Sequence, residues 1–234
     1  YTMSYWLIVP AAGKGKRFGG QLPKQYLSLG QSTVMQTTLN RLSTLSEITQ
    51  IIVPIHPEDD IAQTLTYQNP EKIRFVTGGA ERADSVLAGL EAIKTQTKPD
   101  DWVLVHDVAR PCVRLADIRL MFTQLATDTV GGILAAPVRD TIKQSADNGE
   151  NHIIATVPRQ QLWQAFTPQM FRFDVIYQAL TQALLQNHLV TDEASAVELL
   201  GLKPRLITGA LDNLKITYPE DLLLAEFLIR QQTT

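Results

Sequence analysis

Short apolar runs of strand length alternate along this chain with segments of helical periodicity, and this alternation limits the fold more than any other feature of the sequence. The strand-like runs include Tyr5–Val9, Ile51–Ile55, Ile73–Val76 and Trp102–Asp107. Between them, apolar residues recur every three to four positions, as they do over Thr33–Leu45. Strands separated by helices predict an α/β fold with a mainly parallel sheet and helices on both of its faces.

The same alternation continues to the C-terminal end of the sequence. Two further strands are predicted at Gly131–Val138 and Arg205–Thr208, and a short one near Lys215–Thr217. Further helices are predicted from Pro57, through Val86–Ile93, and at Leu115–Ala126, Phe173–Gln186, Asp192–Leu200 and Pro219–Arg230.

The segment between Asp140 and Pro158 breaks this pattern. Two strand-like stretches flank Ala146–Gly149, which contains the turn-forming pair Asn-Gly, so we predict an inserted β-hairpin. We expect a single domain over residues 1–234 with a β-arm at about 139–158. Pattern alone leaves open whether the arm lies on its own domain or projects onto a partner subunit.

Composition excludes several classes of protein. Cys112 is the one cysteine, which rules out an intramolecular disulfide framework and a cysteine-based metal cage. The net charge of −3 gives no overall field that would attract nucleic acid. No apolar run approaches the ~18–20 residues that a membrane-spanning helix needs. We therefore expect a cytoplasmic, globular protein with no membrane or nucleic-acid partner.

A basic, glycine-rich segment follows the first predicted strand. In an open parallel sheet, ligands bind outside the carboxyl ends of the strands, which is where this segment must lie. Its small residues allow backbone N–H groups to approach an anion, and its cations suit a triphosphate or pyrophosphate. The candidate residues in this loop are Ala11, Ala12, Gly13, Lys14, Gly15, Lys16 and Arg17.

Two common phosphate-binding motifs do not match this loop. A P-loop requires Ser or Thr where Arg17 stands, and the dinucleotide fingerprint requires a third glycine where Phe18 stands. An anion-binding loop of another kind and a basic surface turn remain the two interpretations. Pro23 restricts the backbone just before Lys24, so we expect that lysine to be held in place more firmly than a surface lysine.

Two other strand ends carry polar candidates. Asp107 ends the strand-like run that begins at Trp102 and faces the phosphate loop across the sheet, as a Mg²⁺ ligand would. A pairing of Asp107 with Arg110 is compatible with that role, and His106 is interpreted as structural. The second strand end is followed by a segment that could recognise a base edge, or simply cap a helix: Gly79, Ala80, Arg82 and Ser85. Within it, Arg82 favours either a phosphate or a carboxylate partner.

Basic and hydroxyl residues recur later in the chain and together could form a second anion site. These are Thr141, Arg159, Thr167, Thr191 and Lys215. Sequence spacing does not show that they converge.

The order of these motifs resembles that of the 2-C-methyl-D-erythritol 4-phosphate cytidylyltransferases of the non-mevalonate isoprenoid pathway. The resemblance runs from about Leu7 to Leu228. It is carried by PAAGKGKRFGGQLPKQYL, GGAERADSVLAGL, HDVARPCV, PVRDTIKQ, VPRQQLWQAFTPQ, TDEASAVELLG and LDNLKITYPEDLLLAEFLI. It implies a Rossmann-like nucleotidyltransferase domain, a homodimer joined through the β-arm, and Mg²⁺-dependent transfer of CMP from CTP with release of pyrophosphate.

The resemblance also implies roles for the candidate residues. Arg17 and Lys24 correspond to transition-state stabilisers, and Arg159 and Lys215 to residues that position the methylerythritol phosphate. Thr141, Thr167 and Thr191 resemble its supporting contacts, and Asp107 resembles the metal-site acid. The loop from Ala11 to Arg17 resembles the triphosphate cradle, and Gly79, Ala80 and Ser85 resemble the cytosine-reading segment. Lys24 and Arg82 are also expected to bind CTP.

Three points stay open at this stage. Thr141 and Arg159 flank the arm, so the family pattern suggests that they serve the partner's active site. Ala80 stands where some relatives carry an acidic residue, which puts cytosine selectivity in question if the carboxylate is needed. The alternatives are a cytidylyltransferase for another polyol phosphate, such as ribitol 5-phosphate, and a non-catalytic nucleotide-binding regulator.

Overall fold

The computed structural model describes residues 3–13, 22–146, 149 and 151–232. A seven-stranded sheet runs through the molecule in the order β11-β7-β10-β6-β1-β4-β5. Its strands are β1 (Tyr5–Ile8), β4 (Ile48–Ile55), β5 (Ile73–Thr77), β6 (Trp102–Val105), β7 (Gly131–Pro137), β10 (Trp163–Arg172) and β11 (Arg205–Thr208). Neighbouring strands are parallel except β10, which is antiparallel to both β6 and β7. The predicted mainly parallel α/β sheet is therefore confirmed.

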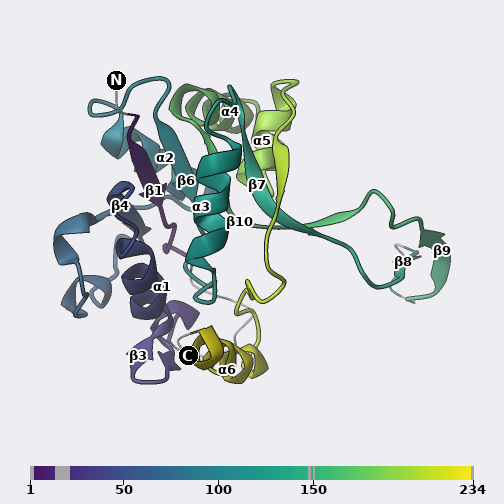
Figure 1. The fold of residues 1–234 in the computed structure, drawn as a ribbon, viewed down its shortest axis with the longest axis horizontal. Helices are drawn as coiled ribbons and strands as arrows, with labels where there is room; N and C mark the ends of the chain where they lie inside the picture. The colour runs from purple at the N-terminus through teal and green to yellow at the C-terminus, as the bar shows by residue number, and fades with distance from the viewer. Residues whose placement is uncertain (1–2, 14–21, 147–148, 150, 233–234) are drawn as a thin grey trace.

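Helices cover both faces of this sheet (Figure 1). They are α1 (Val34–Ser43), α2 (Arg82–Ile93), α3 (Leu115–Gln124), α4 (Phe173–Leu185), α5 (Glu193–Leu199) and α6 (Glu220–Gln232). Successive side chains of a strand point to opposite faces, so Leu7 packs in one core and Ile8 in the other. The first core includes residues of α1 and α3, and the second includes residues of α2, α4 and α5. None of the helices in the described ranges is long and apolar enough to cross a membrane.

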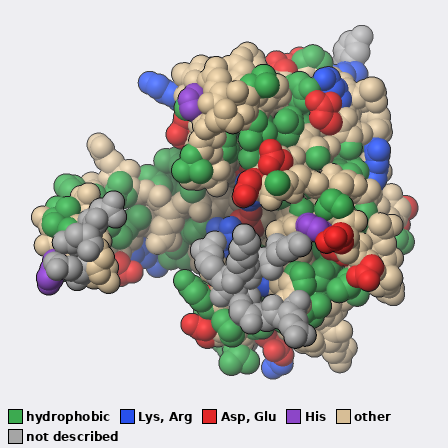
Figure 2. Space-filling view, turned by 180° about the vertical axis from the view of Figure 1, so that it is seen from behind, with side chains coloured by type: hydrophobic (Ala, Val, Ile, Leu, Met, Phe, Trp, Pro, Cys, Tyr) green, Lys and Arg blue, Asp and Glu red, His purple; other side chains and the backbone are tan. Residues whose placement is uncertain are grey.

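The inserted hairpin lies where the sequence predicts it. Strands β8 (Ile142–Ser145) and β9 (Ile153–Val157) pair antiparallel and form no part of the large sheet. The arm lies between the last residue of β7, Pro137, and the first residue of β10, Trp163, which pair with each other in the large sheet. Figures 1 and 2 show the hairpin standing clear of the body of the molecule.

Two local predictions are wrong, and strand β10 and a small hairpin were not expected. No α-helix follows Pro57. Instead, the Asp59 carboxylate accepts hydrogen bonds from the N–H groups of Ile61 and Ala62 and starts a single 3-10 turn, Ala62–Thr64. Residues 215–217 do not form a strand, and the small hairpin consists of β2 (Ser28–Leu29) and β3 (Ser32–Thr33).

Candidate active site

A pocket of about 390 Å³ lies at the carboxyl ends of β1, β5 and β6. Its volume falls within the range of small-molecule sites. Polar residues from four separate segments line it, and Figure 2 shows acidic and basic side chains meeting in the hollow of this face. Of the predicted site residues, the structure brings ten together here: Ala11, Ala12, Gly13, Lys24, Gly79, Ala80, Arg82, Ser85, Asp107 and Lys215.

The remaining predicted residues are not among the described residues that line the pocket. Gly15, Lys16 and Arg17 are outside the described residues, so their place stays a prediction. Thr141 and Arg159 are exposed at the base of the arm, and the Arg159 guanidinium donates to the Arg139 carbonyl. Thr167 lies just behind the pocket, and Thr191 precedes α5, where its N–H donates to the Ser195 hydroxyl over 3.2 Å.

Asp107 is the electrostatic centre of the pocket. Its Oδ1 contacts Arg82 Nε and Nη2, each at 3.1 Å. Its Oδ2 lies 2.9 Å from Lys215 Nζ and 3.4 Å from Arg110 Nε. Burial alone would raise the pKa of this carboxyl, but the three cations outweigh burial and hold it well below its usual range. Asp107 is therefore ionised near neutral pH.

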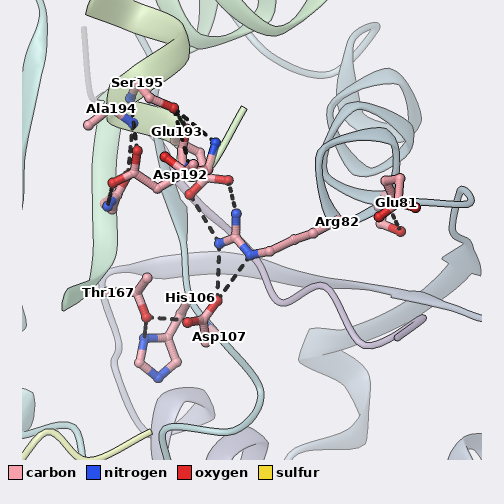
Figure 3. A network of polar contacts seen from close by, with 12 residues as sticks. Glu81, Arg82, His106, Asp107, Thr167, Asp192, Glu193, Ala194 and Ser195 are labelled. Carbon is pink, nitrogen blue, oxygen red and sulfur yellow. Dashed lines mark hydrogen bonds and ion pairs between the residues drawn. The ribbon is translucent and has the colours of Figure 1, made fainter. Parts of the chain in front are cut away.

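Arg82 holds a second carboxylate that the sequence analysis missed. Its Nη1 donates to Glu193 Oε1 at 2.5 Å and its Nη2 to Glu193 Oε2 at 3.1 Å (Figure 3). Burial would lower the pKa of the Arg82 guanidinium, but Glu193 and Asp107 raise it. The two residues of the pair are 111 positions apart, so no local motif could have revealed it.

A buried hydrogen-bond chain fixes the main chain at Asp107. The Asp107 N–H donates to the Thr167 hydroxyl over 3.0 Å, and this hydroxyl lies 3.0 Å from His106 Nδ1. His106 Nε2 lies 3.0 Å from the Arg110 carbonyl, which only accepts, so Nε2 carries the proton and Nδ1 accepts from Thr167. Burial lowers the pKa of His106 to about 4, so the ring is neutral near pH 7. His106 thus has the structural role that the sequence indicated.

Three further hydrogen bonds position Lys24, the segment next to Lys215 and the start of the predicted phosphate loop. The Lys24 ammonium donates to the Ile216 carbonyl over 3.0 Å, and the Ile216 N–H donates to the Ala109 carbonyl over 2.8 Å. The buried Gln25 side chain donates to the Ala11 carbonyl over 3.0 Å. Gln25 was also missed, although it adjoins Lys24 in a motif that the sequence analysis singled out.

The described residues do not form a ready-made metal cage. No three His, Cys, Asp or Glu side chains gather in this part of the chain. Asp107 and Glu81 are the carboxylates among the residues that line the pocket. Mg²⁺ is often held by one or two carboxylates together with substrate phosphates, so this donor set fits a divalent cation that enters with a triphosphate.

Comparisons with known proteins agree on one family. The family model described as 2-C-methyl-D-erythritol 4-phosphate cytidylyltransferase matches residues 5–231. A protein of that description from Hahella chejuensis is 48% identical over 226 residues, covering 97% of this chain and 93% of its own. A second, from Vibrio atlanticus, is 48% identical over 225 residues, covering 96% of this chain and 94% of its own.

Solved structures give the same result. The crystal structure of the Francisella tularensis 2-C-methyl-D-erythritol 4-phosphate cytidylyltransferase superposes with a TM-score of 0.83 at 34% identity, covering 96% of this chain and 99% of that one. A structure described as 4-diphosphocytidyl-2C-methyl-D-erythritol synthase has a TM-score of 0.84 at 34% identity, covering 98% and 99%.

Proposed function

This chain belongs to the 2-C-methyl-D-erythritol 4-phosphate cytidylyltransferase family, and we propose that the pocket around Asp107 carries the family's reaction. The enzyme transfers CMP from CTP to 2-C-methyl-D-erythritol 4-phosphate and releases pyrophosphate, in the non-mevalonate synthesis of isoprenoid precursors. We propose that the enzyme acts in the cytoplasm.

One observation carries the assignment of the site. Lys24, Arg82, Asp107 and Lys215 come from four separate segments of the chain and meet in a single pocket at the carboxyl ends of the strands. Ligands of open α/β sheets bind at this edge. The residues that meet are those that the family resemblance assigned to CTP and to the second substrate.

In the proposed chemistry, one oxygen of the methylerythritol phosphate attacks the α-phosphorus of CTP. The bond between the α-phosphorus and the oxygen that bridges it to the β-phosphorus breaks, and pyrophosphate leaves with that electron pair. A phosphate monoester has its second pKa near 6, so it is largely a dianion at neutral pH and needs no general base. The main obstacle is the approach of two anions, which fixed cations relieve.

We assign the cations to two groups. Lys24, with Lys16 and Arg17 of the phosphate loop, would hold the triphosphate and the leaving pyrophosphate. Lys215 and Arg159 would hold the incoming phosphate. The hydrogen bond from Lys24 to the Ile216 carbonyl supports this role for Lys24. It places the Lys24 ammonium beside the segment that carries Lys215, so the cations of the two groups lie close together.

Mg²⁺ is the proposed divalent cation. It would arrive bound to the phosphates of CTP, with Asp107 as one carboxylate ligand, and when bound it would neutralise charge that develops on the phosphates. Lys215 and Arg110 contact Asp107 Oδ2, and this oxygen would be available to the cation if Lys215 turned toward the substrate phosphate.

The segment before α2 is the proposed reader of the cytosine. Ser85 Oγ accepts a hydrogen bond from the Gly79 N–H over 3.1 Å, which fixes this turn against the helix. Recognition would then use backbone groups of Gly79 and Ala80. On that basis the absence of an acidic side chain at Ala80 would not cost base selectivity.

The arm supports a homodimer as the working form. Thr141 and Arg159 lie at its base and are not among the residues that line the pocket of their own subunit. On β9, Ile153 is 66% exposed and Ile154 60% exposed, and such a pair of apolar side chains is typical of a surface that a partner covers. We propose that the arm delivers both site residues to the partner's pocket.

The first experiment measures pyrophosphate release from CTP and Mg²⁺, with methylerythritol phosphate and ribitol 5-phosphate assayed in parallel. We expect release with methylerythritol phosphate alone. Release with ribitol 5-phosphate instead would keep the mechanism and overturn the substrate. No release with either, from folded protein that still binds CTP, would favour a nucleotide-binding regulator.

A further inference from the structure

Glu193 is a fully buried carboxylate beside the candidate site that no role described above uses. It is the first residue of α5, and its exposed fraction is 0%. A carboxylate removed from water in this way is costly unless it is paired and hydrogen-bonded. Glu193 meets this condition through Arg82 alone among the ion pairs of the described residues, with one guanidinium nitrogen at 2.5 Å and another at 3.1 Å.

The same guanidinium then reaches into the pocket. Arg82 Nε and Nη2 each lie 3.1 Å from Asp107 Oδ1 (Figure 3). A guanidinium has a rigid, planar set of donors, so fixing one edge on Glu193 fixes the direction of the other. Arg82 thereby joins three elements: α2, which carries it, α5, and the segment that follows β6.

The charges in this cluster explain why a second carboxylate is needed. Asp107 faces three cations, Arg82, Arg110 and Lys215. Glu193 balances the charge of Arg82, which leaves Asp107 Oδ2 for Lys215 at 2.9 Å. Without Glu193, the uncompensated Arg82 would bind Asp107 more strongly or turn toward an anion in the pocket.

We propose that Glu193 is a positioning residue that commits Arg82 to Asp107 and keeps its charge away from the substrate phosphates. Arg82 then orients the acid of the site and is not a phosphate ligand, which differs from the role that the sequence resemblance implies. The inference rests on the proposed function, because it concerns the same pocket.

The test is E193Q, which keeps the shape of the side chain and removes its charge. We expect kcat to fall roughly 10–100-fold, the usual effect of removing a group that orients another. CTP binding, measured directly by calorimetry, is expected to be at least as tight as in the wild type, because Arg82 then becomes available to the triphosphate. The matched control is E198Q, an exposed glutamate on the same helix, for which both values are expected to stay unchanged.

A loss of kcat together with an equal loss of CTP binding would overturn the proposal, because that pattern indicates general disruption of the pocket. An unchanged kcat would also overturn it and leave Glu193 as a stabiliser of the fold. Wild-type activity in the same assay tests the proposed function separately. If the wild type is inactive, the proposed function fails, while the direction of the change in CTP affinity still tests the role of Glu193.

Two further variants cover the case in which E193Q does not fold. R82Q and the double variant R82Q/E193Q remove one and both charges of the pair. If Glu193 acts only through Arg82, the double variant has the same reduced kcat as R82Q. A double variant with wild-type kcat, or one much slower than R82Q, would contradict the assignment.

Discussion

Lys24 is the residue whose replacement is most clearly expected to reduce catalysis without disturbing the fold. Its ammonium is half-buried and donates to a main-chain carbonyl, and no apolar core cluster includes it. We expect K24A to remain folded and to lose about 10²–10³ in kcat, because a preorganised donor to the developing charge is removed. The control is K94A, at an exposed lysine that directly follows α2 and does not line the pocket. A folded K24A enzyme with near-normal turnover would exclude the role.

Because the His106 ring is buried, we expect the stability of the fold to depend on pH. Its pKa is about 4 in the folded protein, lowered by burial, against about 6.5 in an unfolded chain. As the pH falls from 6.5 to 4, the unfolded chain takes up a proton that the folded protein does not, so the free energy of unfolding falls by up to roughly 3 kcal/mol over this window.

Urea unfolding of wild type and H106Q at several pH values between 7 and 4 measures this contribution. The variant lacks the titrating ring, so we expect its free energy of unfolding to fall less over the window. The exposed His188 provides the control H188Q, which should follow the wild type. Parallel pH curves for wild type and H106Q would show that the ring is not held neutral.

The sequence revealed those site residues that follow a strand directly. Asp107 and the segment from Gly79 to Ser85 both come at strand ends, where topology alone places them at one edge of the sheet. Glu193 gives no such signal, because its partner Arg82 is on another helix and only the packing of α5 beside α2 and α4 brings them together. For Arg82 the sequence left phosphate and a carboxylate partner open, and the structure shows two carboxylates beside it, Asp107 and Glu193.

At the scale of elements, β10 is the strand of the large sheet that the sequence analysis did not anticipate. Proline within an apolar run argues against a strand, and Pro168 lies inside β10. The structure accommodates it where the pairing with β7 shifts, between Ala165 and Gln169. This strand supplies Thr167, which the sequence offered as a candidate but, without the strand, did not place beside His106 and Asp107.

The turn that precedes α2 has no space for a side chain at Gly79. A Cβ atom there would lie 2.3 Å from the Cβ of Asp84, in the first turn of the helix. We expect G79A to lower the free energy of unfolding by about 1–3 kcal/mol, the usual cost of overpacking. Because the same turn is the proposed reader of cytosine, we also expect CTP affinity to fall at least tenfold, measured by calorimetry.

Gly13 provides the matched glycine. Among the described residues, a Cβ at this position meets nothing within 4 Å, so G13A should change the free energy of unfolding by less than about 0.5 kcal/mol. If the two variants unfold at the same urea concentration, the close contact of Gly79 with α2 is not a determinant of this turn.

At the scale of the whole molecule, the arm places Arg159 away from the pocket of its own subunit. In a symmetric dimer, each arm would then complete the partner's site. We expect K24A and R159A to be nearly inactive when each is assayed alone. A mixed dimer of the two contains one pocket with both defects and one pocket with neither, so mixing the variants should restore activity.

The size of the recovery tests this arrangement. With free subunit exchange, half of the dimers are mixed and each has one intact pocket, so activity should reach roughly a quarter of the wild-type value. The control is a mixture of K24A with K215A, two residues of the same pocket, in which every pocket of a mixed dimer keeps one defect and no activity returns. If the K24A and R159A mixture also stays inactive while subunits exchange, Arg159 acts within its own subunit and the arm does not complete the partner's site.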